Sequence, residues 1–119
     1  MKVTDEQFDR FRNAVDYWLD RFGLHQYGVY VDRCDSHEAY ATISVDEEEK
    51  VAKICQCREL NKDTARYFNP EGNALHEVLH LVLHRICWLG SQRYIERSDL
   101  DEEWEAAVRR LEHGITSRS

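Results

Sequence analysis

Residues 73–84 read Asn-Ala-Leu-His-Glu-Val-Leu-His-Leu-Val-Leu-His, and the apolar members recur at the three- and four-residue spacing of one helical face. This apolar stripe continues to Ile86, and the histidines lie along its edge. Asn69 before Pro70 is a start signal, because asparagine favours the N-cap and proline the first helical position. Gly90 is the matching stop signal. The sequence therefore predicts a helix that begins after Asn69, ends near Gly90 and buries one face.

The predicted helix carries a His-Glu-x-x-His motif at His76, Glu77 and His80. Residues four apart lie one above the other on a helix, so both histidines can turn a ring nitrogen toward one zinc ion, at Zn–N distances of roughly 2.0–2.1 Å. Glu77 then lies beside the metal, where it can take a proton from water that the zinc activates. The alternative is a chance meeting of these residues on an amphipathic helix, since bare motifs of this kind have many false positives. Three histidines on one edge of a buried helix favour the metal site.

Two further residues are candidates for supporting roles. His84 is eight residues from His76, or about 12 Å along the axis, so the two cannot share one ion on a straight helix. We expect His84 to support the ligands or to line the substrate cleft, with a surface histidine as the alternative. Tyr94, in the link after the helix, is a candidate for stabilising an oxyanion; the alternative is a partly buried loop tyrosine.

The third zinc ligand is expected from the acidic segment near the C-terminus, because a catalytic zinc keeps three protein ligands and one open position. Helical periodicity places one apolar stripe on the last helix, made of Trp104, Ala107, Val108, Leu111 and Ile115. Glu105 borders this stripe at mid-helix, and we expect it to be the ligand. The alternative ligands are Asp101, Glu102 and Glu112, and the remaining alternative is an ordinary solvated acidic face.

The C-terminal half of the chain resembles the small gluzincin-type metallopeptidases. The resemblance is carried by the run from His76 to His84, a short link, and a helix that reads Glu-Ala-Ala-Val-Arg-Arg-Leu-Glu at 105–112. Such metallopeptidases include ImmA/IrrE-like proteins and bacteriophage metallopeptidase-like proteins. The resemblance covers about the C-terminal half of the chain and implies one zinc on His76, His80 and a downstream glutamate, with Glu77 as general base. Leu79 stands where the ImmA/IrrE pattern commonly has glycine, and no DNA-binding extension is recognisable.

The N-terminal half predicts one helix and three strands. Thr4 and Gln7 have the form of a capping box, and aromatic residues then recur at helical spacing until Gly23. The pattern next changes to β-branched and aromatic residues with strand periodicity. The predicted elements are a helix at 5–22 and strands at 27–31, 39–45 and 51–58.

We therefore expect a single α+β domain over residues 1–119 with a minimal zincin-like fold. Its parts are an N-terminal helix, a small, mainly antiparallel three-stranded sheet, the active-site helix, and a C-terminal helix carrying the third ligand. The acidic link at 46–50 is expected to be a solvated turn that joins the second and third strands as a hairpin. The third strand is expected to offer a free edge to an extended substrate.

The composition of the chain argues against a nucleic-acid-binding protein and against a membrane-spanning one. The net charge of −7 argues against a nucleic-acid partner, because such affinity depends largely on Lys and Arg. No stretch approaches the ~20 apolar residues of a membrane span, and the N-terminus does not resemble a signal peptide. The expectation is a cytoplasmic zinc peptidase acting on protein or peptide substrates, in the host cytoplasm if the chain is phage-encoded. The alternative is a non-catalytic zincin-like module that binds a protein partner.

Overall fold

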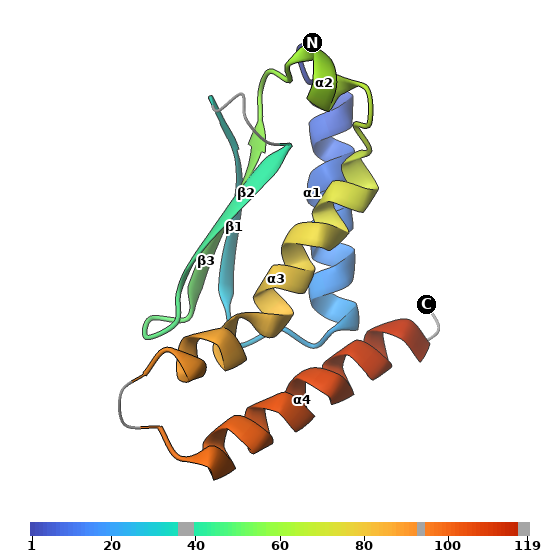
Figure 1. Cartoon of the computed structure of the whole chain (residues 1–119). Helices are drawn as coiled ribbons and strands as arrows, with labels where there is room; N and C mark the ends of the chain where they lie inside the picture. Colours follow the sequence, from blue (N-terminus) through green and yellow to red (C-terminus); the bar gives the residue numbers. More distant parts are fainter. Residues whose placement is uncertain (36–39, 93–94, 117–119) are drawn as a thin grey trace.

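The computed structural model describes residues 1–35, 40–92 and 95–116, and it confirms the α+β class (Figure 1). Three strands form one sheet, and helices lie beside it. In chain order the elements are α1 (Asp5–Arg21), β1 (Gly28–Cys34), β2 (Ala41–Asp46), β3 (Val51–Cys57), α2 (Lys62–Ala65), α3 (Pro70–Gly90) and α4 (Arg97–Thr116).

Helix α1 begins at the predicted residue and ends at Arg21, one residue before the predicted end. Thr4 accepts a hydrogen bond from the backbone of Gln7, and the Gln7 side chain accepts one from the backbone of Thr4, so both halves of the capping box are present. Gly23 has φ +65°, the left-handed conformation that turns the chain out of the helix. The apolar face of α1 is core, with Phe11 and Val15 fully buried.

The sheet is mixed, so the prediction of a mainly antiparallel sheet is wrong. The strand order is β1-β3-β2, with β1 parallel to β3 and β2 antiparallel to it. The hairpin of β2 and β3 is as predicted. Strands β1 and β2 lie on opposite sides of β3, so β1 is the neighbour of β3 and not of β2, and the β1–β3 pair is parallel. Side-chain alternation fixes which face of a strand is buried but not which strand lies beside it.

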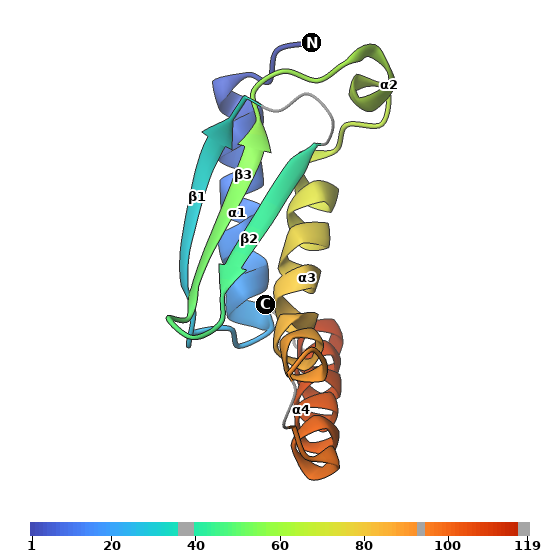
Figure 2. The same cartoon turned by 60° about the vertical axis from the view of Figure 1, so that its left-hand side comes forward.

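This strand order corrects a second prediction, since β3 is central and both its edges are paired. Among the described strands, β2 has a free edge on the side of α3. Figures 1 and 2 show α1 and α3 against one face of the sheet, with α3 beside β2. The core between these layers includes Phe11, Ile54, Val78 and Leu81.

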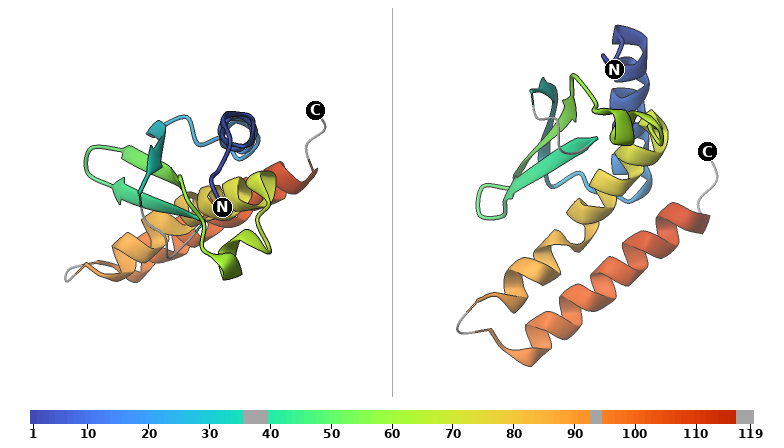
Figure 3. Two further views of the ribbon diagram at one scale, coloured as in Figure 1. Left: turned by 90° about the horizontal axis from the view of Figure 1, so that it is seen from above. Right: turned by 45° about the horizontal axis from the view of Figure 1, so that its top comes forward.

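Helix α4 runs back along the second half of α3 (Figure 3). The face it buries matches the predicted apolar stripe only in part, since Ala107 is buried and Leu111 packs against the core. Ala107 and Gly114 are its buried residues. From the predicted stripe, Trp104, Val108 and Ile115 are exposed, at 62%, 43% and 76%. Periodicity gives most weight to large apolar side chains, whereas α4 makes its close contact through small ones. The helix ends at Thr116.

Two smaller findings complete the fold. A short helix, α2, lies in the segment predicted as a connection, and Asn61 caps it through a hydrogen bond from Thr64 N to Asn61 Oδ1 of 2.8 Å. Within the described part of the chain, no helix has the length and apolar character needed to cross a lipid bilayer.

Candidate metal centre

The two motif histidines meet on α3. Their Nε2 atoms lie 3.2 Å apart, and their rings are nearly perpendicular, at 81° with centroids 4.8 Å apart. Two nitrogens that bind one tetrahedral zinc at roughly 2.0–2.1 Å are separated by about 3.3 Å. His76 and His80 therefore present their nitrogens at the spacing that a shared zinc ion requires.

Glu77 lies beside this pair and is buried, with only 7% of its surface exposed. Burial raises the pKa of its carboxyl, and the nearby His76 and His80 partly oppose that shift. A carboxyl with a raised pKa binds a proton more readily near neutrality, which suits a general base.

The motif faces a hollow of about 590 Å³ between α3 and β2. Helix α3 contributes a wall of mainly polar residues, and β2 contributes an apolar wall through alternate residues on one face of the strand. The lining residues are Ala41, Ile43, Val45, His76, Glu77, His80, Leu83, His84 and Cys87. The fold therefore brings β2 next to the motif, where the sequence predicted β3.

The predicted third ligand does not join the two histidines in this structure. Glu105 is exposed on α4, as are the alternatives Asp101, Glu102 and Glu112. In residues 1–35, 40–92 and 95–116, no three His, Cys, Asp or Glu side chains form a group that could hold a metal ion. Two of the three predicted ligands are thus together, and Glu105 as the third stays a prediction.

The acidic residue of α4 that faces α3 is Glu103. Its Oε1 atom accepts a hydrogen bond from Arg85 Nε at 2.9 Å. The sequence did not single out Glu103, because the expected apolar stripe is only in part the face that α4 buries. Weighting the pattern by large apolar side chains therefore displaced both the predicted buried face of α4 and the predicted position of its acidic residues.

Sequence reasoning missed Glu47, which is buried at the turn between β2 and β3. Its side chain has no exposed surface. It accepts hydrogen bonds from Tyr27 Oη at 2.8 and 3.0 Å, from His84 Nδ1 at 2.9 Å and from Arg85 Nη1 at 3.3 Å, and it pairs with Lys50. The prediction that this turn is solvated is wrong for Glu47. No local signal separates Glu47 from its acidic neighbours, because all of its partners except Lys50 come from distant segments.

Hydrogen bonds to the Glu47 carboxyl keep it ionised. Burial by itself would raise the pKa of the carboxyl, but hydrogen bonds from Lys50, Tyr27 and His84 outweigh burial and lower the pKa to about 2. Burial and the bond to Glu47 in turn raise the pKa of Tyr27. Glu47 is therefore an ionised carboxylate that only accepts hydrogen bonds.

The remaining predicted residues have different outcomes. His84 lies in the wall of the hollow, and its Nδ1 atom contacts Glu47. Tyr94 falls outside the described residues.

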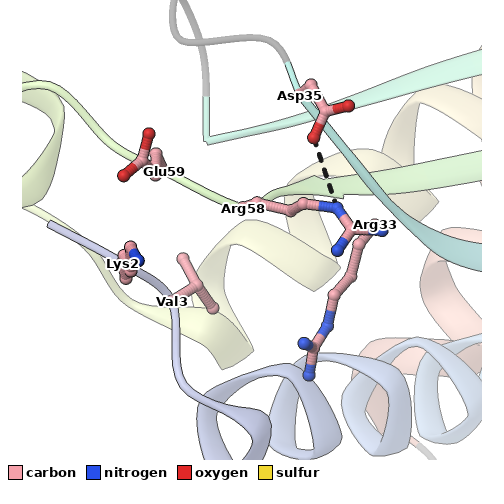
Figure 4. Close-up of a pocket in the computed structure, with 6 residues that line it drawn as sticks. All are labelled: Lys2, Val3, Arg33, Asp35, Arg58 and Glu59. Atoms are coloured by element: carbon pink, nitrogen blue, oxygen red, sulfur yellow. Dashed lines mark ion pairs between the residues drawn. The ribbon is translucent and has the colours of Figure 1, made fainter.

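A second hollow, of about 560 Å³, lies at the carboxyl ends of β1 and β3 and is lined largely by charged side chains (Figure 4). Arg58 pairs with Asp35 at 3.3 Å, and Arg33 pairs with Asp5 at 2.7 Å. Since its arginines are matched by nearby carboxylates, this hollow has the character of a solvated ionic surface.

Comparison of the chain with protein-family models, curated proteins and solved structures gave no match. The resemblance to small gluzincin-type metallopeptidases therefore stays a prediction.

Proposed function

We propose that this chain is a zinc-dependent peptidase in which His76 and His80 hold the ion and Glu77 is the general base. The observation that supports this proposal most strongly is the 3.2 Å separation of the two Nε2 atoms beside a buried carboxyl group. When bound, zinc supplies a Lewis acid that makes water a stronger nucleophile at neutral pH and polarises a carbonyl group.

The chain's own residues perform the proton transfers. Glu77 takes a proton from the attacking water and later gives it to the leaving amine, so one carboxyl serves as base and then as acid. Its raised pKa favours the first transfer. Ile43 and Val45 form the apolar side of the hollow, where apolar parts of a substrate can pack beside the motif.

The substrate class follows from the free edge of β2. An extended peptide can add to such an edge through backbone hydrogen bonds, which would carry a peptide bond past His76 and His80. A protein or peptide substrate is therefore proposed, and no nucleic acid, in view of the net charge of −7.

A second candidate, a non-catalytic zincin-like module that binds a protein partner, is favoured by one observation. The described residues bring two ligands together, where a catalytic zinc usually has three from the protein. In that case the hollow would bind a segment of a partner and leave it uncut.

Zinc content and cleavage, measured on the same preparations, separate the two candidates. Wild type should carry about one zinc per chain and cleave members of a quenched fluorescent peptide library. His80→Ala should lose zinc and cleavage, whereas Glu77→Gln should keep zinc and lose about 10²–10⁴-fold in rate.

His25→Ala is the matched control, since His25 is an exposed histidine whose recorded ion pair is with Asp20 on the surface. It should behave as wild type. A wild type that holds zinc but cleaves no peptide, with Glu77→Gln indistinguishable from it, would support the binding module. A wild type that takes up no zinc when zinc is offered would overturn the peptidase.

A further inference from the structure

The buried carboxylate of Glu47 determines which nitrogen of His84 carries hydrogen. Because Glu47 is ionised, it can only accept, so the contact of 2.9 Å requires a proton on His84 Nδ1. The other ring nitrogen, Nε2, is then the one available to the hollow that His84 lines. In the neutral imidazole this atom carries the lone pair and accepts a hydrogen bond.

Glu47 itself is held in place from several sides. Tyr27 Oη donates to both carboxylate oxygens, and Lys50 and Arg85 contact the same group. These partners come from the segment before β1, from the turn before β3 and from α3. A carboxylate restrained in this way cannot turn without breaking several of these contacts, including the bond from the buried Tyr27 hydroxyl, which would be costly. The His84 ring is therefore fixed by a group that is itself fixed.

The Nε2 atom of His84 lies among mainly apolar side chains in the hollow. Among residues 1–35, 40–92 and 95–116, the groups that line the hollow besides the three motif residues and His84 are aliphatic side chains and one weakly polar thiol, from Ala41, Ile43, Val45, Leu83 and Cys87. A peptide lying in the hollow would thus meet one polar side chain beyond the motif, and that side chain is His84.

We propose that His84 is a substrate-binding residue whose Nε2 atom accepts a hydrogen bond from a backbone N–H of the bound peptide, and that Glu47 is its positioning residue. This inference rests on the proposed peptidase function and deepens it. One helical turn separates His84 from His80, so the contact falls on a peptide unit adjacent to the bond that is cut. The aliphatic lining indicates apolar side chains on the residues of the substrate that lie there.

Two substitutions of His84 separate its two nitrogens. Asparagine places an N–H near the position of Nδ1, so His84→Asn can keep the bond to Glu47 while removing the atom that reaches the hollow. Glutamine is longer and can place its amide oxygen near the position of Nε2. The kinetic probe is the peptide that wild type cleaves best in the fluorescent library, with zinc content and Tm measured for each variant.

We expect His84→Asn to keep its zinc and a Tm close to wild type, and to raise KM about tenfold with a smaller change in kcat. His84→Gln should recover part of the loss. Wild-type KM in a folded, zinc-loaded His84→Asn variant would overturn the inference while leaving the peptidase in place.

A second readout does not depend on cleavage. Long-range ¹H–¹⁵N spectra of the histidine rings report which nitrogen is protonated. His84 should carry its proton on Nδ1 in wild type, and this preference should weaken in Glu47→Gln, because a glutamine side chain can donate as well as accept. A His84 ring protonated on Nε2 in wild type, alone or together with Nδ1, would overturn the inference, even if no peptide proved to be a substrate.

Discussion

Arg85 of α3 donates through Nε to Glu103 of α4 at 2.9 Å, and the same guanidinium contacts Glu47 through Nη1 at 3.3 Å. One side chain thus joins the second long helix, the β2–β3 turn and the last helix. With Glu103 turned toward α3, Glu105 is left exposed. The arrangement of α4 therefore bears directly on the identity of the third ligand.

Zinc titration will test this arrangement of α4. Because Glu105 is exposed and does not join the histidines, Glu105→Gln should bind zinc as tightly as wild type, whereas His76→Ala and His80→Ala should each lose at least tenfold in affinity. Competition with a chromogenic chelator measures these affinities. A comparable loss in Glu105→Gln would show that α4 turns when zinc binds, as the sequence-based prediction requires.

Glu77→Gln should stabilise the metal-free protein at neutral pH. Burial raises the folded-state pKa of Glu77, so its stabilising contribution is present below the ordinary value of 4.5 and is lost as pH rises through the raised value. Near pH 7 the wild type bears the cost of a buried charge, which glutamine removes. Thermal unfolding with chelator present should give a higher Tm for Glu77→Gln.

Glu105→Gln is the control for that comparison, because Glu105 is exposed and its Tm should not change. The advantage of Glu77→Gln should also shrink as pH falls through the raised pKa of Glu77, where the folded wild type takes up the proton, and should be gone below pH 4.5. A Tm equal to or lower than that of wild type at pH 7 would show that the buried charge carries no such cost.

Glu47 should make the protein sensitive to acid. Its pKa is lowered from 4.5 to about 2, so its contribution to stability is complete above pH 4.5 and is lost as pH falls toward 2. The shift corresponds to about 3 kcal/mol of free energy of unfolding. Urea unfolding between pH 6 and pH 3 should show the fall in wild type and a shallower one in Glu47→Gln. Equal slopes would mean that the carboxylate is less restrained than its contacts indicate.

Gly114→Ala should loosen the packing of α4. A Cβ atom at Gly114 would collide with the ring of Phe22, so the substitution should cost about 1–3 kcal/mol. Gly90→Ala is the control, because a Cβ atom there meets nothing within 4 Å and alanine favours the helix. Chemical unfolding of both variants checks the contrast. An unchanged Gly114→Ala would show that α4 does not pack on α1 through this residue.

The sequence by itself determined what depends on neighbours along the chain. Each local signal acts within its own helix: the capping box at Thr4 in α1, and the N-cap at Asn69 and the spacing of His76 and His80 in α3. The two helices and the meeting of the two histidines therefore followed from local geometry. The β2–β3 hairpin likewise followed from two strands joined by a short link.

Only the tertiary structure decided which surfaces meet. The parallel pairing of β1 with β3, the free edge of β2 and the buried face of α4 depend on contacts between segments far apart in sequence. The burial of Glu47 has the same origin, since Tyr27, Lys50, His84 and Arg85 reach it from three parts of the chain. Periodicity reports how apolar each face of an element is, but the packing of several faces together determines which face is covered and which charge is enclosed.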